Sequence, residues 1–222
     1  MKKKIIIITL VSSMISILIY FYTKKEEINI VAIGDAISLG MTPYNIKGYS
    51  FNDYLKEKYN SNRELHSYYE YASVGKTVKE LTYEIKENKS LIINDKKQGI
   101  QQIINNANIL TITIGMDELS EDKITLDIIK DYLKDMEELL KLIKSLNNKK
   151  VIVTGLYTIK KKELLSINKI NTSLRELCSS YNFIFIDIST ILTDNNYYFE
   201  PNNYYLNYLG NKAIYSEIIK KL

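Results

Sequence analysis

The sequence of 222 residues is poor in several residue types that mark specialised classes of protein: it has one cysteine, one histidine, two prolines and no tryptophan. The single cysteine, Cys178, excludes an internal disulfide and leaves the redox compartment undecided. Because Cys178 lies in a helical pattern, we expect a buried filler rather than a nucleophile. Internal repeats and long low-complexity tracts are also lacking, and the length suits one α/β domain with an N-terminal appendage.

A large excess of one charge sign is lacking as well. The formal charge is +4, but five lysines and two glutamates precede residue 28, which leaves 25 basic and 24 acidic residues after it (30 minus 5, and 26 minus 2). The excess positive charge belongs to the N-terminus, so the composition gives no indication of a nucleic-acid partner. We expect no cofactor and no metal.

The first 27 residues have the pattern of a membrane segment. Lysines at residues 2–4 are followed by an uncharged run, residues 5–23, and then by two lysines and two glutamates. The run is just long enough to span a bilayer as a helix and also suits a long signal peptide. Bulky residues 20–22 favour an uncleaved transmembrane anchor, and the lysines predict that residues 28–222 lie on the extracytoplasmic side of the cell membrane. Secretion after signal cleavage is the alternative.

From residue 28 onward, strand-like and helix-like patterns alternate. Runs of β-branched, aliphatic and aromatic residues predict five strands, at 28–34, 66–74, 108–115, 150–155 and 183–188. Apolar residues at helical spacing predict helices at 49–59, 76–87, 100–107, 124–146, 162–181 and 209–221. This alternation predicts one α/β domain, residues 28–222, in which helices wind doubly around a five-stranded parallel sheet to form a three-layer sandwich.

The stretch from Ile28 to Gly40 predicts a loop at the carboxyl edge of this sheet, where open α/β sheets bind ligands. A buried strand stops at Gly34 and Asp35, a turn dipeptide, and small residues with a second glycine follow. Residues 34–40, Gly-Asp-Ala-Ile-Ser-Leu-Gly, resemble the first block of the GDSL/SGNH hydrolases, Gly-Asp-Ser-Leu-Ser/Thr-x-Gly. The resemblance implies a flavodoxin-like fold and serine esterase chemistry, but Ala36 stands where the family has its nucleophilic serine.

Two further blocks of the family match the ends of the second and third strands. Gly75 matches the glycine whose backbone N–H helps to bind the oxyanion, and the resemblance implies that Asp35, Gly75 and Gly115 surround that cleft. The third block, Gly-x-Asn-Asp, is Gly-Met-Asp-Glu here, so Asp117 replaces the asparagine that donates to the oxyanion. An ionised carboxylate only accepts hydrogen bonds and repels a negative charge. A protonated Asp117 would still donate, which requires a raised pKa.

The last block of the family, Asp-x-x-His-Pro before the C-terminal helix, supplies the orienting acid and the general base. Alignment on Gly210 puts Asn202 at the aspartate position and Tyr205 at the histidine position. The one histidine of the chain, His66, lies at the far end of a strand, and we expect a surface or half-buried residue rather than a relocated base. The nucleophile, the side-chain oxyanion donor, the base and the acid of the family are each replaced, by Ala36, Asp117, Tyr205 and Asn202, which implies a degenerate member without the triad.

Two substitutes for the lost chemistry stay open. Ser38, two residues past the nucleophile position, is an alternative nucleophile, although a serine hydroxyl without a neighbouring imidazole is poorly activated. Asp117 and Glu118 form a carboxylate pair that suits a cation or sugar hydroxyls, or else a solvated stretch before a helix.

The leading hypothesis is a membrane-anchored, extracytoplasmic, SGNH-hydrolase-like protein that has lost catalysis and binds cell-envelope glycan or acyl-ester groups in the old cleft. One alternative is an active acyl or acetyl ester hydrolase of envelope polymers with a non-standard nucleophile, and another is a structural protein with a vestigial cleft. Tyrosines that suit sugar stacking, or equally a partly packed loop, are Tyr44, Tyr197, Tyr198, Tyr204, Tyr205 and Tyr208.

Overall fold

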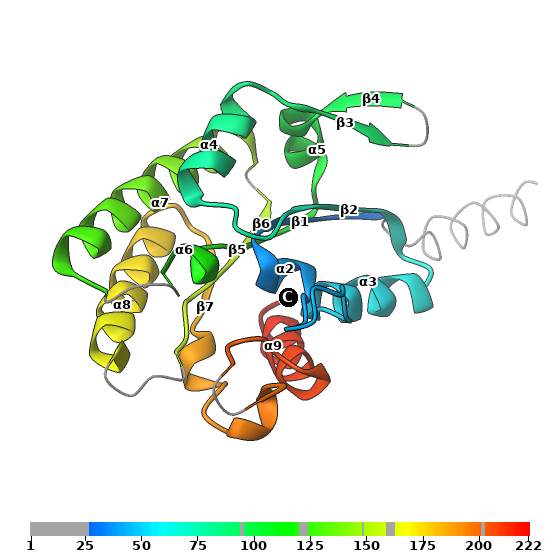
Figure 1. Ribbon diagram of the computed structural model, residues 1–222. Helices are drawn as coiled ribbons and strands as arrows, with labels where there is room; N and C mark the ends of the chain where they lie inside the picture. Colours follow the sequence, from blue (N-terminus) through cyan, green and yellow to red (C-terminus); the bar gives the residue numbers. More distant parts are fainter. Residues whose placement is uncertain (1–26, 94–95, 120–123, 148, 159–162, 201–202) are drawn as a thin grey trace, which may run out of the picture.

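Five parallel strands form the central sheet of the protein in a computed structural model, which describes residues 27–93, 96–119, 124–147, 149–158, 163–200 and 203–222 (Figure 1). The strands are β1 (Ile28–Gly34), β2 (Leu65–Ala72), β5 (Ile109–Thr113), β6 (Lys150–Thr154) and β7 (Ile184–Ile186). Their order in the sheet is β2-β1-β5-β6-β7, and every neighbouring pair is parallel. The predicted five-stranded parallel sheet is therefore confirmed.

The central strands are buried on both faces, as their composition requires. All five residues of β5 are buried, and so are the last five of β1. β-Branched side chains suit such positions because they pack well against neighbours on a pleated surface. The edge strand β2 is rich in tyrosine and mostly half-buried, with polar groups that still reach solvent.

Helices cover both faces of the sheet (Figure 1). On one face, α3 (Phe51–Ser61) packs against α9 (Tyr208–Lys221). On the other face, α7 (Leu126–Leu146) contacts α4 (Val78–Lys86), α5 (Ile100–Asn106) and α8 (Leu164–Ser180). Ser50 and Asp53 form a reciprocal capping box where α3 begins, two residues after the predicted start of this helix.

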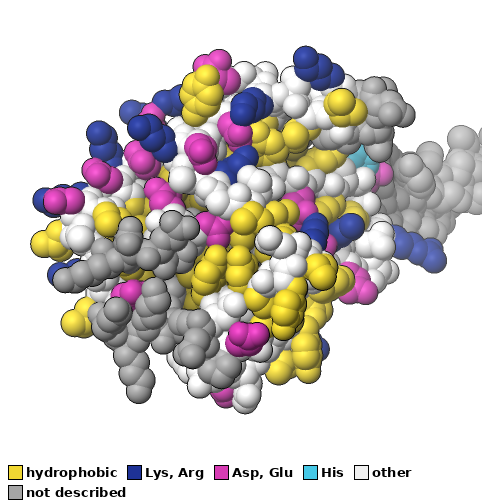
Figure 2. All heavy atoms as spheres, viewed as in Figure 1, with side chains coloured by type: hydrophobic (Ala, Val, Ile, Leu, Met, Phe, Trp, Pro, Cys, Tyr) yellow, Lys and Arg dark blue, Asp and Glu magenta, His cyan; other side chains and the backbone are white. Residues whose placement is uncertain are grey.

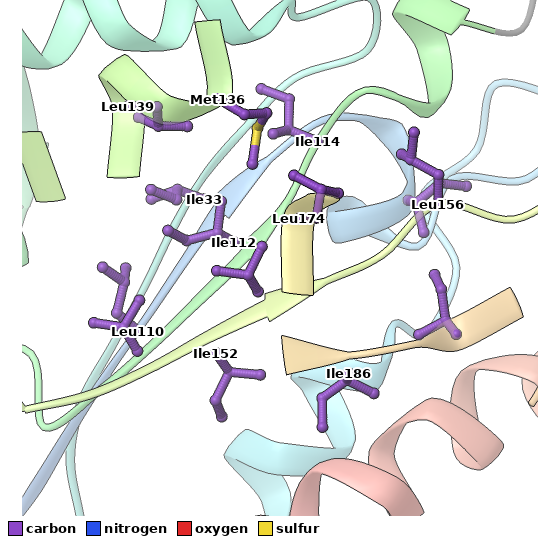
Figure 3. Packing of buried hydrophobic residues seen from close by; sticks show 14 of the residues in the cluster. Ile33, Leu110, Ile112, Ile114, Met136, Leu139, Ile152, Leu156, Leu174 and Ile186 are labelled. Carbon is purple, nitrogen blue, oxygen red and sulfur yellow. The ribbon is translucent and has the colours of Figure 1, made fainter. Parts of the chain in front are cut away.

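Figure 3 shows how the sheet divides the hydrophobic core into two layers. Ile33 of β1 and Ile112 of β5 point to the side of α7, where they lie near Met136. Ile152 and Ile186 point to the opposite side, toward α3 and α9. This alternation along each strand fixes the register, because a slip of one residue would exchange the two layers.

Two short elements differ from the sequence interpretation. The predicted loop after β1 is a one-turn helix, α2 (Ala36–Leu39), which begins because the Asp35 side chain caps it and ends at Gly40 in the left-handed conformation. An antiparallel hairpin, β3 (Ser90–Ile93) with β4 (Lys96–Gly99), was not predicted, since four-residue strands are too short to show a period.

No helix among the described residues is long and apolar enough to cross a membrane. The predicted anchor, residues 1–27, lies outside the described residues apart from Glu27, so it stays a prediction. Described structure begins beside the amino edge of the sheet, where β1 starts.

The end of β1 lies so close to the end of β5 that only glycine fits there. A Cβ atom at Gly34, whose φ is +150°, would lie 1.8 Å from the carbonyl oxygen of Thr113. Gly75 has a φ of +74°, but a Cβ atom there would meet nothing within 4 Å. The two glycines therefore separate the cost of a steric clash from the cost of an unfavourable backbone conformation.

We expect Gly34→Ala to lower the free energy of unfolding by more than about 3 kcal/mol, because the β1–β5 contact must open. Gly75→Ala, the matched control, should cost only about 1–2 kcal/mol, since it strains the backbone alone. Urea unfolding followed by circular dichroism measures both values. Equal costs for the two variants would contradict the close contact.

Candidate functional site

The segments that carry the candidate site lie at the carboxyl ends of β1, β2 and β5. The sheet order reverses between β1 and β5, because the chain moves outward to β2 on one side and to β5 on the other. Such a topological switch point opens a crevice outside the carboxyl ends of the strands. The segments after these strands are α2, the turn around Gly75 and the one-turn helix α6 (Met116–Leu119).

The Asp117 carboxylate on α6 is bound by the groups that would hold an oxyanion in this arrangement. Its Oδ2 accepts hydrogen bonds from the backbone N–H groups of Gly75, at 2.7 Å, and Ala36, at 3.3 Å. Its Oδ1 accepts from the Tyr204 hydroxyl at 3.0 Å. Three donors from three separate segments thus converge on one carboxyl group, an arrangement that suits a negatively charged acceptor.

Ala36 takes the place at the N-terminus of α2 that the resemblance gives to a nucleophile. The residue is fully buried, and its side chain is a methyl group without chemistry. Only its backbone N–H is directed to the site, where it meets Asp117. Position 36 therefore contributes a hydrogen-bond donor and no reactive atom.

Asp35 lies beneath the site and is fully buried. Its Oδ1 accepts from the Ile37 N–H at 3.0 Å, and its Oδ2 accepts from the Met116 N–H at 2.9 Å. Burial, followed by the negative charge of Asp117, raises the pKa of Asp35 to about 7, against the opposing effect of these backbone N–H groups and that of Gly115. The hydrogen bond with Met116 links the end of β1 to α6. Asp35 and Gly115, which the resemblance placed around the cleft, are not among the described residues that line it.

Glu118 accepts a hydrogen bond from one further backbone N–H group, at the start of α4. Its Oε2 accepts from the N–H of Val78, the first residue of α4, at 3.1 Å. Burial raises the pKa of Glu118, and the nearby charges of Asp135 and Glu80 add to the effect. The predicted carboxylate pair Asp117–Glu118 is therefore bound to backbone N–H groups rather than standing free before a helix.

A cleft of about 450 Å³ opens over these carboxylates. Its lining residues are Val74, Gly75, Thr77, Asp117, Glu118, Tyr204 and Tyr205. The rings of Tyr204 and Tyr205 stack at 4.5 Å between centroids, and the hydroxyl of buried Tyr157 donates to the Tyr204 carbonyl oxygen. Tyr205, at the position of the family's histidine, therefore borders the cleft as the resemblance implies.

The other predicted site residues lie elsewhere or outside the described residues. Ser38 is fully buried on α2, and Asn52 of α3 donates to its hydroxyl oxygen at 3.3 Å, so the structure does not bring Ser38 to the cleft. His66 is exposed at the start of β2 and pairs with Glu27 at 2.8 Å. Asn202, at the position of the family's aspartate, is not among the described residues.

The six tyrosines proposed for sugar stacking lie in different places, with Tyr208 63% exposed at the start of α9 and Tyr197 half-buried against the core. Tyr204 and Tyr205 line the cleft. Tyr198 is buried, and its hydroxyl donates to the Leu192 carbonyl oxygen, so it belongs to the core. Tyr44 is 65% exposed and contacts Phe199 edge to face.

Figure 2 shows that hydrophobic side chains gather over α2, α3 and α9, whereas charged ones crowd the side of α4 and α7.

Two features of the site were missed from the sequence. One is the hydrogen bond between Tyr204 and Asp117, and the other is the binding of Glu118 to the start of α4. The Thr77–Glu80 capping box, which marks where α4 begins, was a usable signal for the second. No three-residue cluster of His, Cys, Asp and Glu suited to a metal occurs among the described residues.

Comparisons with known proteins agree with this architecture. The pattern of the GDSL-like lipase/acylhydrolase family matches residues 30–218, and the chain belongs to that family. It is similar in structure to an acetylxylan esterase from Geobacillus stearothermophilus, with 15% identity, a TM-score of 0.65, and coverage of 89% of this chain and 94% of that one. No curated protein matches the sequence.

Two metagenomic enzymes also share the fold. A lipase from a goat rumen metagenome is 17% identical, with a TM-score of 0.67 and coverage of 87% of this chain and 96% of that one. An α/β hydrolase from the metagenome of Lake Arreo, Spain, is 15% identical, with a TM-score of 0.64 and coverage of 89% and 95%. At these identities the likeness concerns the fold.

The raised pKa of Asp35 predicts how the free energy of unfolding depends on pH. Its pKa is about 7 in the folded protein and 3.8 in its ordinary state, so the folded protein retains a proton that the unfolded chain releases. The contribution of Asp35 to the free energy of unfolding is therefore complete below about pH 4 and is lost as the pH rises through 7. We expect this free energy to fall between about pH 4 and pH 7.

The variant Asp117→Asn removes the charge that adds to the pKa shift of Asp35, so the fall should move to lower pH. Urea unfolding at several pH values measures the profile of each protein. His66→Gln, which removes the single imidazole from an exposed site, is the control and should leave the profile unchanged. A profile that rises with pH, or one that Asp117→Asn leaves in place, would contradict the Asp35–Asp117 coupling.

Proposed function

We propose that this protein is a membrane-anchored, extracytoplasmic member of the GDSL-like family that binds a cell-envelope glycan in its cleft and does not hydrolyse esters. The family membership supports an acyl-ester-hydrolase-like architecture. The loss of catalysis rests on one observation: the Asp117 carboxylate occupies the backbone N–H groups of Ala36 and Gly75. A substrate carbonyl oxygen needs these same donors when it becomes an oxyanion.

The remaining catalytic positions support the same proposal. Ala36 offers no nucleophile, and Ser38, the alternative, is buried and hydrogen-bonded to Asn52. Tyr205 supplies a phenol where the family has an imidazole. An acyl transfer to a serine needs the nucleophile, its base and the oxyanion donors together, so each of these replacements acts against it.

The cleft keeps the shape and the surfaces of a binding site. Two stacked tyrosine rings form part of its wall, and tyrosine combines an apolar face with a polar edge, as a sugar ring does. The acetylxylan esterase among the similar structures has a saccharide in its name. The filled oxyanion donors favour the glycan part of such a ligand over its acyl-ester group as the feature recognised here.

The location is proposed from the sequence of the first 27 residues. Their uncharged run and the lysines before it favour a single membrane-spanning anchor with the domain outside the cytoplasm. Secretion after cleavage of the same segment is the alternative.

The purified protein should show no turnover of a short-chain activated ester. A restored variant with Ala36→Ser, Asp117→Asn, Asn202→Asp and Tyr205→His should gain activity. The matched control carries the same changes but keeps Asp117. We expect it to be slower by a factor on the order of 10²–10³, which is the typical cost of losing one oxyanion donor. Initial rates at equal protein concentration measure the difference.

Clear ester turnover by the unsubstituted protein would overturn the proposal. If Ser38→Ala then abolished that turnover, the hydrolase with a non-standard nucleophile would replace it. Equal rates for the restored variant and its Asp117 control would show that the carboxylate does not block the oxyanion position.

The proposed location predicts that the protein stays with the membrane fraction after alkaline carbonate washing. It also predicts that an external protease digests the domain in cells whose membrane is intact, because residues 28–222 face outward. Immunoblotting measures both results. Release of a shortened protein into the medium would favour the cleaved form instead.

A further inference from the structure

The cleft wall presents hydrogen-bond acceptors, whereas an oxyanion site presents hydrogen-bond donors. The backbone N–H groups of Ala36 and Gly75 both donate to Asp117 Oδ2, and that of Val78 donates to Glu118 Oε2. The Tyr204 hydroxyl donates to Asp117 Oδ1. These donors are consumed by the protein itself, so the wall presents carboxylate oxygens to whatever enters the cleft.

The described residues that line the cleft carry charge of one sign. Among them are two carboxylates and no lysine, arginine or histidine. Lys76, next in sequence to Gly75, is turned away: its ammonium group pairs with Glu84 at 2.5 Å and lies 4.5 Å from the centroid of the Tyr71 ring. A ligand in this cleft therefore meets a negative potential, which favours a cation and disfavours an anion.

The stacked rings of Tyr204 and Tyr205 add a second preference of the same kind. Their centroids lie 4.5 Å apart on one wall of the cleft. The face of an aromatic ring carries negative charge density and attracts an ammonium group as well as the C–H groups of a sugar. Carboxylates and aromatic faces together suit a sugar that carries a protonated amine.

We infer that Asp117 is a specificity-determining residue, which makes the cleft select saccharides with free amino groups over their N-acylated counterparts. This inference rests on the proposed glycan binding and names the class of glycan. The carbonyl oxygen of an N-acyl group is a hydrogen-bond acceptor. It would face the carboxylates of Asp117 and Glu118, which are acceptors too, and the backbone N–H groups beside them already donate to these carboxylates. An ammonium group donates three hydrogen bonds and carries the matching charge.

The test compares two probes on the full-length protein in detergent: the tetrasaccharide of glucosamine and the tetrasaccharide of N-acetylglucosamine. Isothermal titration calorimetry at pH 6 and low salt measures both dissociation constants. We expect the glucosamine tetrasaccharide to bind at least about tenfold more tightly, which corresponds to about 1.4 kcal/mol. We also expect added salt to weaken its binding, since the attraction is electrostatic.

Asp117→Asn should lose this preference, because an amide side chain carries no negative charge and offers an NH2 donor in place of one of the two acceptor oxygens. Asp131→Asn is the matched control, since it removes an equal charge from an exposed position on α7 and should leave the preference intact. Circular dichroism spectra check that both variants are folded. The comparison of the two probes on the unsubstituted protein needs no variant.

The outcomes separate the inference from the proposed function. Binding of both tetrasaccharides with equal affinity, or tighter binding of the acetylated one, overturns the inference and leaves glycan binding in place. Binding of neither overturns the proposed glycan binding and the inference with it. A preference for glucosamine that Asp131→Asn abolishes as fully as Asp117→Asn does would assign the effect to net charge and overturn the role of Asp117.

Discussion

One interaction joins the separate parts of the site: the Asp117 carboxylate with the backbone N–H groups of Gly75 and Ala36. It links the segments that follow β5, β2 and β1, and through Tyr204 it reaches the chain before α9. Backbone donors cannot be removed by side-chain substitution, and leaving the Ala36 N–H unsatisfied in its partly buried place is costly. A carboxylate supplied by the chain itself meets that requirement.

The same interaction changes how Asp117, which stands where the family has an asparagine, is interpreted. From the sequence, Asp117 was expected to repel an oxyanion, which is correct as a statement about charge. A carboxylate is, however, itself an oxygen anion, so a site built to hold one accommodates the other. The structure thus shows a filled site rather than a merely repulsive one, with Asp35 buried directly below and its pKa raised to about 7.

Much of the fold could be predicted because its signals are local. The nearly continuous aliphatic run of β5 and the Ser50–Asp53 capping box identify a buried strand and a helix start within a few residues. The contacts of Asp117 join residues 42 and 81 positions away, so their geometry depends on the assembled sheet. The burial of Ser38 likewise depends on how α2 packs against Asn52 of α3. Short elements such as the β3–β4 hairpin carry too few residues to show a pattern.

The direction of β1 has a consequence for how the cleft is displayed. Glu27 lies at one edge of the sheet and the cleft at the other, with the seven residues of β1 between them. At about 3.3 Å per residue, the strand separates the two edges by about 23 Å. Because this strand is hydrogen-bonded on both sides, it acts as a rigid spacer. The cleft therefore opens at the end of the sheet opposite to the one where the described chain begins, so a ligand can reach it without passing that end.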